Sequence, residues 1–340
     1  MKALTFEGPG RRVWHEMPDP VVSRSEDALV RVDAVTICGT DLHILQGDVP
    51  EVKPGRVLGH EAVGTVQEVG PAVVGFAPGD RVLISCIAGC GRCRYCRENH
   101  DGQCTSGGGW TLGHLIDGTQ AELVRVPYAD RGLHHLPDTV SDEQALLLAD
   151  ILPTAYEVGV LNGRVTPGSS VAVVGAGPIG LAAVLTARLL SPSRIVVVDP
   201  AAERRAAALR LGADEVVADA AEALETARDV DTAIEAVGVP ETFELCTELV
   251  RAGGVVANVG VHGAPATLHL ESLWARNVTI TTGLVDTYST PTLLQMVASG
   301  QLDTEGLVTH RFGLDEIQDA YDVFSRPQDS GALKVAMFNQ

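Results

Sequence analysis

The hexapeptide GAGPIG at residues 175–180 constrains the fold of this chain more than any other feature. It follows a continuous apolar run at 170–174 and precedes a longer stretch with helical character. Glycines here permit a tight turn, let a pyrophosphate approach the backbone and let the helix pack closely on the strand, while the helix N-terminus supplies N–H donors. The pattern predicts a dinucleotide site, against the plainer alternative of an ordinary strand–helix turn. The residues expected at the cofactor are Gly175, Gly177, Pro178, Ile179 and Gly180.

An acidic residue closes the next apolar run and bears on the choice of cofactor. Asp199 follows RIVVV at 194–198, 19 residues after Gly180. A carboxylate at this position accepts hydrogen bonds from the ribose hydroxyls and repels a 2′-phosphate. We therefore predict NAD over NADP. Arg204 is the opposing feature, because a nearby arginine can accommodate that phosphate.

The chain changes character near residue 152. Before it, short apolar runs are separated by Gly and Pro, which is typical of a small β-barrel or sandwich; the clearest runs are 28–35, 59–69 and 80–84. After it, apolar runs alternate with helical segments, which predicts a doubly wound parallel sheet. The runs expected as strands are 170–174, 194–198, 215–217, 232–235, 255–259 and 278–281, with helices at 179–190 and 201–211. The tail carries a predicted helix at 314–325 and a strand at 332–338.

The composition excludes several classes of partner. The 340 residues carry 44 Asp and Glu against 25 Lys and Arg, a formal net charge of −19. Such a surface repels phosphate backbones and anionic lipid, so nucleic acid and membrane surfaces are poor partners. The N-terminus shows no signal-peptide pattern, and the apolar region at 171–190 is interrupted by glycines, a proline and an arginine. We expect a cytoplasmic, reducing location, where clustered cysteines are more often metal ligands than disulfides.

Four of the seven cysteines lie within one 15-residue segment. Cys90, Cys93, Cys96 and Cys104 have the spacing C-x₂-C-x₂-C-x₇-C. Four thiolates at this spacing are typical of a tetrahedral structural zinc site with no open coordination position. The segment therefore predicts a zinc that folds the loop and takes no part in catalysis; unpaired thiols on a loop are the alternative.

Two further motifs, CGTDLH at 38–43 and GHE at 59–61, are ambiguous when read from the residues alone. A cysteine and a histidine more than twenty residues apart are weak evidence for a metal site. From the residues alone, a buried cysteine and a core histidine with ordinary hydrogen bonds are the favoured explanation.

The chain resembles the medium-chain zinc-dependent alcohol dehydrogenases over essentially its whole length. The matching features, in order, are CGTDLH, GHEAVG, the four-cysteine loop, GAGPIG with its following aspartate, and LKV at 333–335. The resemblance implies a GroES-like β-barrel catalytic domain at 1–152 and a Rossmann NAD-binding domain at 153–290. It also implies a C-terminal segment, 291–340, that returns to the catalytic domain.

The same resemblance implies a catalytic zinc. Cys38, His60 and Asp150 match its permanent ligands, and Glu61 matches a ligand that swings in when water or substrate leaves. At the position of Asp150, liver-type enzymes have a cysteine and polyol dehydrogenases typically have a glutamate. The aspartate favours the bacterial secondary-alcohol branch. The alternative is that Asp150 is only a carboxylate at a helix end. Thr40 matches the hydroxyl that contacts the substrate oxygen, and His43 matches a proton-relay histidine nearer solvent.

Further contacts are implied by position in the family alone. Thr154 matches a contact to the nicotinamide carboxamide, and Lys334 matches a cofactor phosphate contact. The backbone positions expected to line the nicotinamide are Val237, Val259 and Leu284. Trp110 matches an aromatic wall of the substrate pocket, and Cys86 is expected near the active cleft.

The leading hypothesis is an NAD-dependent zinc alcohol dehydrogenase or ketone reductase acting on secondary alcohols, with hydride passing between the substrate carbon and the nicotinamide. A polyol, 2,3-butanediol or threonine-type dehydrogenase is an alternative with the same machinery. From another class, the chain could be a non-catalytic zinc- and dinucleotide-binding protein. The resemblance implies a homo-oligomer, with a tetramer favoured over a dimer.

Overall fold

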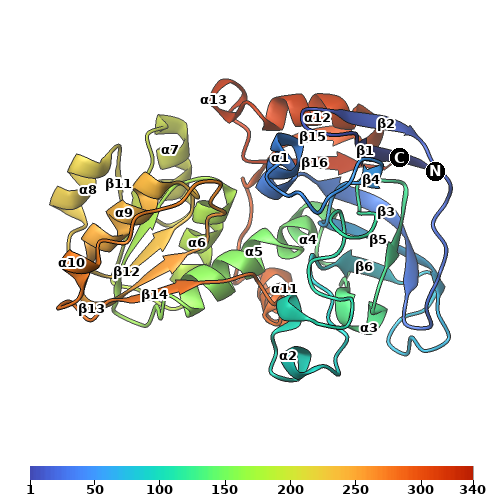
Figure 1. The fold of residues 1–340 in the computed structure, drawn as a ribbon, viewed down its shortest axis with the longest axis horizontal. Helices are drawn as coiled ribbons and strands as arrows, with labels where there is room; N and C mark the ends of the chain where they lie inside the picture. The colour runs from blue at the N-terminus through green and yellow to red at the C-terminus, as the bar shows by residue number, and fades with distance from the viewer. Residues whose placement is uncertain (340) are drawn as a thin grey trace. The chain divides into compact units, whose positions relative to one another are not determined.

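The computed structural model describes residues 1–339 and divides into two compact units (Figure 1). Unit 1 comprises Met1–Asp150, Asp286–Gln301 and the chain from Val308 onward, and unit 2 comprises Ile151–Val285 and Leu302–Leu307. The chain therefore leaves unit 1 directly after Asp150 and first returns to it at Asp286.

Unit 1 is built mainly on antiparallel strands. Its strands are β1 (Lys2–Phe6), β2 (Arg12–Glu16), β3 (Ala28–Thr36), β4 (Arg56–Val57), β5 (Ala62–Val69), β6 (Arg81–Ile84), β7 (Leu123–Val126), β8 (Leu133–His135), β15 (Val308–Gly313) and β16 (Lys334–Phe338). Strands β15 and β16 pair in parallel. The main sheet has the order β15-β16-β3-β5-β6-β8, with β7 also paired to β3, and β1 lies between β2 and β4 in a smaller sheet. Alternate residues of β3 are buried, so one face of this strand joins the apolar core of the unit.

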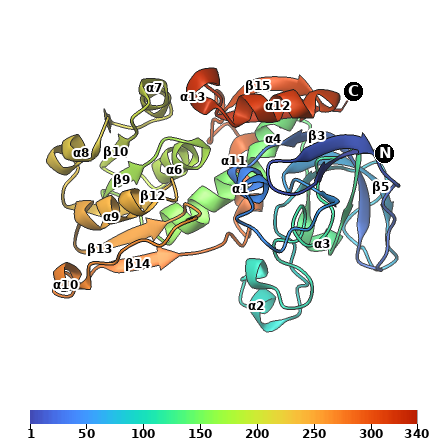
Figure 2. The same cartoon turned by 45° about the horizontal axis from the view of Figure 1, so that its top comes forward.

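The last strand of the chain completes this sheet. Strand β16 pairs antiparallel with β3, with Ala336 opposite Thr36, so the red C-terminal segment lies beside the blue N-terminal strands (Figure 2). The helices of unit 1 are α1 (Gly39–Gln46), α2 (Arg94–Arg97), η1 (Asp101–Gln103), α3 (Ala129–Gly132), α4 (Asp142–Leu148), α11 (Thr290–Ala298), η3 (Leu314–Glu316), α12 (Ile317–Phe324) and α13 (Pro327–Ser330). Helix α12 contributes Ile317, Tyr321 and Phe324 to the core.

Unit 2 contains a parallel sheet of the order β11-β10-β9-β12-β13-β14. Its strands are β9 (Ser170–Val174), β10 (Arg194–Val198), β11 (Glu215–Val217), β12 (Val230–Glu235), β13 (Val250–Asn258) and β14 (Thr279–Thr282). Its helical segments are α5 (Ile151–Thr154), the π-helix η2 (Ala155–Leu161), α6 (Pro178–Arg188), α7 (Ala202–Arg210), α8 (Ala220–Thr226), α9 (Pro240–Leu249) and α10 (Leu270–Leu273). The α/β fold class predicted from the alternating pattern is confirmed.

The strand order reverses between β9 and β12, which are neighbours although two strands separate them in the chain. In open parallel sheets, ligands bind outside the carboxyl ends of the strands at such a point. The Gly-rich turn leaves β9 there. The core below it is formed by β-branched strand residues and by one face of α9, where Cys246 is fully buried.

Several predicted elements differ from the observed ones at their ends. The strand expected at 59–69 begins only at Ala62, because Gly59 adopts a positive φ of 91° that interrupts extended backbone. The helix expected at 314–325 begins as the 3₁₀ turn η3, where the Gly313 N–H donates to Glu316 Oε2 at 2.7 Å. Propensity places such elements, but the local hydrogen bonds set their ends.

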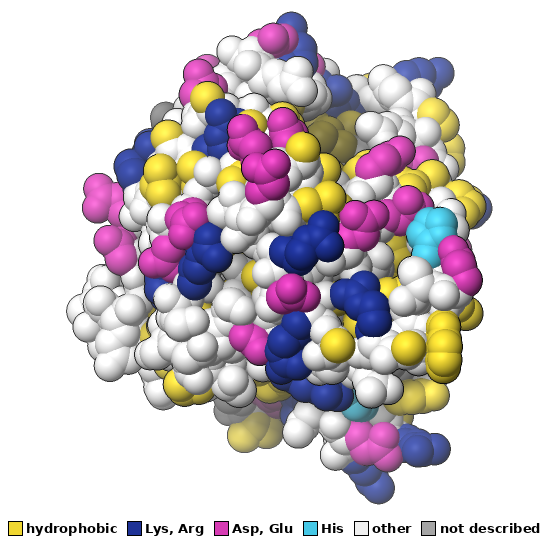
Figure 3. Space-filling view, turned by 90° about the vertical axis from the view of Figure 1, so that its left-hand side faces the viewer, with side chains coloured by type: hydrophobic (Ala, Val, Ile, Leu, Met, Phe, Trp, Pro, Cys, Tyr) yellow, Lys and Arg dark blue, Asp and Glu magenta, His cyan; other side chains and the backbone are white. Residues whose placement is uncertain are grey.

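Within residues 1–339, the helical run Asp142–Leu161 is long and apolar enough by length and composition to cross a membrane, and 78% of its most apolar part is buried inside the structure. Burial of this kind is also found in core helices. On the face shown in Figure 3, acidic and basic side chains are interspersed with apolar ones.

Candidate active site and structural metal site

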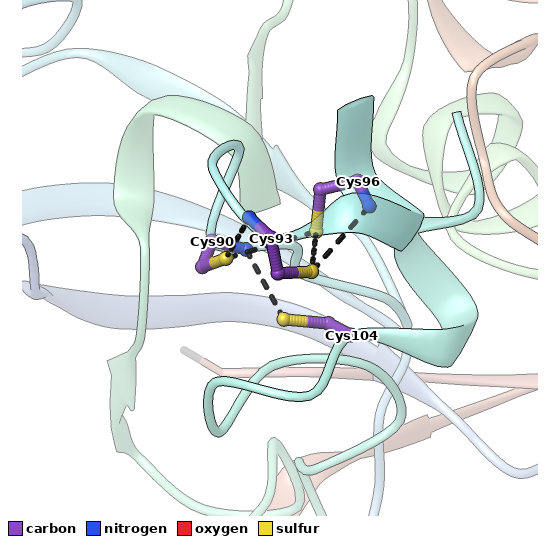
Figure 4. Close-up of side chains that lie close together, drawn as sticks. All are labelled: Cys90, Cys93, Cys96 and Cys104. Atoms are coloured by element: carbon purple, nitrogen blue, oxygen red, sulfur yellow. Dashed lines mark hydrogen bonds between the residues drawn. The ribbon is translucent and has the colours of Figure 1, made fainter. Parts of the chain in front are cut away.

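The four clustered cysteines converge on one point (Figure 4). Their sulfur atoms all lie within 4.8 Å of one another, with Cys93 Sγ 3.4 Å from Cys96 Sγ and Cys90 Sγ 3.9 Å from Cys96 Sγ. Thiolates about 2.3 Å from a tetrahedral zinc lie about 3.8 Å apart. These residues therefore fit a four-thiolate zinc site.

Local backbone geometry prepares these sulfurs for metal. The Cys93 N–H, just before α2, donates to Cys90 Sγ at 3.3 Å. The Cys96 N–H, within α2, donates to Cys93 Sγ at 3.5 Å. Hydrogen bonds from the backbone of Cys96 and Thr105 lower the pKa of Cys93 to about 6. A thiolate is the form that binds metal, so the loop favours the ligating state.

A second cluster combines Cys38, His60, Glu61 and Asp150, and one donor atom from each lies within 4.8 Å of the others. Cys38 precedes α1, the adjacent pair precedes β5, and Asp150 lies two residues after α4. Cys38 Sγ lies 3.5 Å and His60 Nε2 lies 3.4 Å from Asp150 Oδ2. Ligands of a tetrahedral zinc lie about 3.3–3.8 Å apart, so this spacing fits as well.

The electrostatics of this cluster also fit a cation. His60, Glu61 and Asp150 are buried, at 4%, 1% and 9% exposure. Burial raises the pKa of the Cys38 thiol, and the neighbouring Asp150 raises it further. Burial would lower the pKa of His60, but its contacts with Asp150 and Cys38 raise it well above the usual value. Several acidic groups crowded out of water require compensating positive charge, which a divalent metal provides.

Lys334 is buried beside the second cluster. Its side chain is 1% exposed, and Nζ donates to Glu61 Oε2 at 2.5 Å and to the Ile37 carbonyl at 3.0 Å. The lysine of the LKV motif therefore lies on β16 and neutralises the carboxylate beside His60. Its expected contact with a cofactor phosphate stays a prediction.

The other residues expected near the substrate are placed as follows. Thr40 Oγ1 lies 3.6 Å from Cys38 Sγ, at the start of α1. His43 is half-buried, and its Nδ1 lies 2.8 Å from Asp48 Oδ2. The ring of Trp110 packs edge-on to His60 at 6.1 Å between centroids and stacks on His114 at 4.2 Å. Cys86 is buried, and its N–H donates to the carbonyl of Ala149, the residue before Asp150.

The Gly-rich turn in unit 2 has the geometry that its sequence predicts. Gly175 adopts a φ of 100°, and a Cβ on Gly180 would lie 1.8 Å from the Gly175 carbonyl oxygen, so only glycine permits the close approach. Gly177 is the N-cap of α6, and a Cβ there would meet nothing within 4 Å. The open space beside a helix N-terminus fits a pyrophosphate.

Asp199 is buried at the end of β10. Its Oδ2 accepts from the Ala176 N–H and its Oδ1 from the Ala201 N–H, both at 2.8 Å, so the carboxylate is held against the Gly-rich turn. Arg204 Nη1 lies 3.9 Å from Asp199 Oδ2. The neighbouring Arg205 donates to the Asp199 carbonyl at 2.8 Å and fixes the chain after the strand.

The remaining cofactor positions also lie in unit 2. Thr154 ends α5, where the helix passes into η2. Val237 and Leu284 are exposed, at 47% and 44%, and Val259 directly follows β13. Exposed apolar side chains following strands β12 and β14 are compatible with a ligand-lining role, which stays a prediction for all four residues.

Sequence reasoning missed three buried polar residues beside the second cluster. Asp41, within CGTDLH, is 1% exposed and Oδ1 lies 4.0 Å from His60 Nδ1. Gln120 and Tyr321 are fully buried and hydrogen-bonded to each other. An aspartate inside a candidate ligand motif was a usable signal for Asp41. No sequence pattern connects Gln120 with Tyr321, which lie 201 residues apart.

The fold and the two sites together define a class of protein. A four-thiolate site and a mixed thiolate, imidazole and carboxylate site lie in a β-rich unit, and a separate parallel sheet carries a dinucleotide-type turn. This combination is that of a zinc-binding oxidoreductase with a nucleotide cofactor.

Comparison with known proteins assigns the family. Residues 24–138 match the alcohol dehydrogenase GroES-like domain, and residues 178–299 match the zinc-binding dehydrogenase domain. The chain belongs to the medium-chain zinc-dependent alcohol dehydrogenase family. It is 36% identical to an alcohol dehydrogenase of Cupriavidus necator, covering 99% of this chain and 98% of that one.

Solved structures agree with this assignment. The apo form of zinc dependent alcohol dehydrogenase 2 from Streptococcus pneumonia superposes with a TM-score of 0.96 at 47% identity, covering 100% of this chain and 99% of that one. A zinc-binding dehydrogenase structure from Sinorhizobium meliloti 1021, bound to NADP, superposes with a TM-score of 0.87 at 31% identity, covering 99% and 98%. The chain is therefore a zinc-dependent alcohol oxidoreductase.

Proposed function

We propose that this protein uses NAD(H) to interconvert secondary alcohols and ketones at the Cys38, His60 and Asp150 cluster. The observation that carries the proposal is the convergence of these donor atoms at tetrahedral spacing in a buried site. Zinc bound there would supply Lewis acidity to the oxygen of an alcohol or carbonyl substrate. The carboxylate ligand Asp150, where liver-type relatives have cysteine, favours the secondary-alcohol branch.

The surrounding side chains suit a proton-transfer role. The Thr40 hydroxyl, 3.6 Å from Cys38 Sγ, is near enough to the ligand cluster to hold the substrate oxygen by a hydrogen bond. His43, whose side chain is 30% exposed, lies nearer to solvent and is paired with Asp48, so it suits a proton exit. Trp110 and Cys86 are proposed to shape the substrate pocket.

The proposed preference for NAD rests on Asp199. Its carboxylate is fixed at the turn by two backbone N–H groups, where it would repel a 2′-phosphate. Arg204 and the NADP-bound relative from Sinorhizobium meliloti argue the other way. We expect kcat/KM with NADH to exceed that with NADPH at least about tenfold, corresponding to ~1.4 kcal/mol. Asp199→Ala should reduce the ratio, and Arg204→Ala should not; a higher kcat/KM with NADPH in the wild type overturns the preference.

The substrate class is tested by a panel followed through NADH absorbance, with and without a chelator. We expect secondary alcohols and ketones to have the highest kcat/KM and chelation to abolish turnover. Vicinal diols, polyols or L-threonine as the best substrates would support the alternative dehydrogenases. One zinc ion per chain by elemental analysis, with no turnover on any of these compounds, would indicate a non-catalytic zinc- and dinucleotide-binding protein.

The assembly and location are proposed on family resemblance. We expect a homotetramer in preference to a dimer, which light scattering coupled to size-exclusion chromatography measures directly. A cytoplasmic location is likewise expected, and cell fractionation tests it.

A further inference from the structure

A buried chain of hydrogen bonds runs from the C-terminal helix α12 to the ligand cluster. The Tyr321 hydroxyl donates to Gln120 Oε1 at 2.8 Å, and Gln120 Nε2 donates to Asp41 Oδ2 at 3.0 Å. All three side chains are at most 1% exposed. Buried polar networks strongly determine local geometry, because each unmade hydrogen bond leaves a desolvated polar group.

Asp41 connects this chain to two of the proposed metal ligands. Its Oδ2 also accepts from the Cys38 N–H at 2.9 Å, which fixes the backbone of the cysteine at the start of α1. Its Oδ1 lies 4.0 Å from His60 Nδ1, and both of these atoms are buried and have no hydrogen-bond partner within residues 1–339. The 4.0 Å separation places the Asp41 carboxylate beside this nitrogen but beyond direct hydrogen-bond distance. A carboxylate that accepts a hydrogen bond from the second nitrogen of a ligating imidazole sets its tautomer and orientation, and Asp41 is the group placed to do so. His60 Nε2, which faces Asp150, is then left to bind metal.

Gln120 can support Asp41 in only one orientation of its amide. Nε2 must face the carboxylate, and it also lies 3.4 Å from the Thr36 carbonyl. Rotating the amide by half a turn would direct Oε1 at both of these acceptors. These two acceptors therefore set the orientation of the amide, and the Tyr321 hydroxyl completes it by donating to Oε1. Burial raises the pKa of Tyr321 well above its usual value, so the hydroxyl keeps its proton.

The outer end of the chain is fixed at the surface of unit 1. The guanidinium of Arg12, on β2, lies 4.9 Å from the centre of the Tyr321 ring. Arg12 is held there by an ion pair with Asp322 at 2.5 Å and a hydrogen bond to the Gln318 carbonyl at 3.0 Å. The phenol is thus clamped between the surface arginine and Gln120.

We propose that Gln120 and Tyr321 are positioning residues for the catalytic metal centre, acting through Asp41 on Cys38 and His60. The proposal rests on the metal site of the proposed function. It extends that site to the C-terminal helix α12, which lies far from all three ligands in the sequence. The alternative is that the two residues only stabilise the core.

The test measures metal affinity and ligand geometry in Tyr321→Phe, Gln120→Leu and the double variant. Zinc affinity is measured by competition with a chromophoric chelator. The Cys38→Ser variant should lose only the zinc of the catalytic site, so comparison with it shows which of the two binding steps belongs to that site. Visible spectra of the cobalt-loaded proteins report the ligand field. Tyr128→Phe is the control, because it removes another buried phenol, whose hydroxyl donates to the Ser106 carbonyl outside the chain of bonds.

We expect each single variant to weaken zinc binding at the catalytic site about three- to tenfold, the size of one buried hydrogen bond. The cobalt bands should shift, and Tyr128→Phe should leave affinity and bands unchanged. Asp41→Asn, which faces the histidine directly, should weaken binding about 10- to 100-fold. Because Tyr321 acts through Gln120, the double variant should bind no more weakly than Gln120→Leu.

The proposal is overturned if the folded single variants keep the wild-type zinc affinity and cobalt spectrum. A lower melting temperature alone would then show that the two residues only stabilise the core. Additive losses in the double variant would exclude action through Gln120. If Tyr321→Phe does not fold, the zinc affinity and cobalt spectrum of Gln120→Leu test the proposal on their own. Failure of the wild type to bind a second zinc would instead refute the metal centre of the proposed function.

Discussion

The two metal-ligand clusters differ in how the chain assembles them. The four cysteines come from one segment of 15 residues, in which turns and backbone N–H groups direct every sulfur inward. The second cluster takes its members from three separate segments, and these meet only when β3, β5 and α4 pack. One cluster is local and partly exposed, and the other is dispersed and buried.

This difference separates their chemistry. A four-thiolate set fills all positions of a tetrahedral zinc and can only stabilise its loop. The dispersed set offers Cys38, His60 and Asp150 as ligands, while the ion pair with Lys334 holds Glu61. With these three as the proposed ligands, a tetrahedral zinc would keep one position open, which is the arrangement that catalytic zinc sites require. The first two of the four predictions that follow test this division of roles, and the other two concern buried titratable groups outside the proposed ligand sets.

The largest expected effect is on turnover when the dispersed cluster loses a ligand. Cys38→Ser and Asp150→Asn should each lower kcat at least about 10³-fold, because Lewis-acid stabilisation of the transition state is worth several kcal/mol. Steady-state kinetics with metal analysis measures this, and cofactor binding followed by fluorescence should persist. Full activity in both variants would contradict the catalytic assignment.

The local cluster should respond in the opposite way. Cys93→Ser should remove one zinc per chain and lower the free energy of unfolding by at least about 4 kcal/mol, because zinc binding at a thiolate site contributes to folding. The folded fraction should keep kcat within about threefold, assayed at low temperature. Loss of kcat in protein that is still folded, with unchanged stability, would reverse the two roles. Arg94→Ala, on the exposed side of the same loop, is the matched control.

A smaller effect is expected from the buried ion pair beside the dispersed cluster. Lys334→Met should lower the free energy of unfolding by about 3 kcal/mol, the low end for breaking a buried pair. Burial already raises the pKa of Glu61 to about 7, so the carboxylate can take up a proton when its partner is gone. A folded-state pKa above the unfolded value makes the variant less stable as pH rises. Denaturant unfolding at pH 5.5 and 8 should show the larger loss at pH 8; a pH-independent loss would contradict the pairing.

The smallest expected effect concerns a buried histidine without such partners. His134, on β8, has an Nε2 with no hydrogen-bond partner among residues 1–339, and burial lowers its pKa to about 4. The unfolded chain binds this proton near pH 6.5, so stability is lost as pH falls from 6.5 towards 4. Between pH 7 and pH 5 the wild type should lose about 2 kcal/mol more than His134→Phe, measured by denaturant unfolding. Equal losses would show that His134 titrates normally.

The outcome for individual residues shows what a pattern can predict. The strands at 170–174 and 194–198 and the Gly-rich turn were predicted at their observed positions, because buried parallel strands and glycine turns are local signals. The pairing of Lys334 with Glu61 was not predicted, because a lysine in a C-terminal motif does not reveal whether its side chain faces solvent or the core. The predicted domain boundaries at 152 and 290 stay predictions, while the compact units of the structure divide at Asp150 and Asp286.

The sequence by itself determined the four-cysteine site, the parallel sheet with its dinucleotide turn and the family. Each of these depends on residues that are close in the chain or on short motifs in a fixed order. Only the tertiary structure brought Asp150 to Cys38 and His60, placed Lys334 on Glu61 and joined Tyr321 to Asp41 through Gln120. The physical reason is that contacts between distant segments are set by strand pairing and by core packing around β3 and β16, which no local pattern encodes.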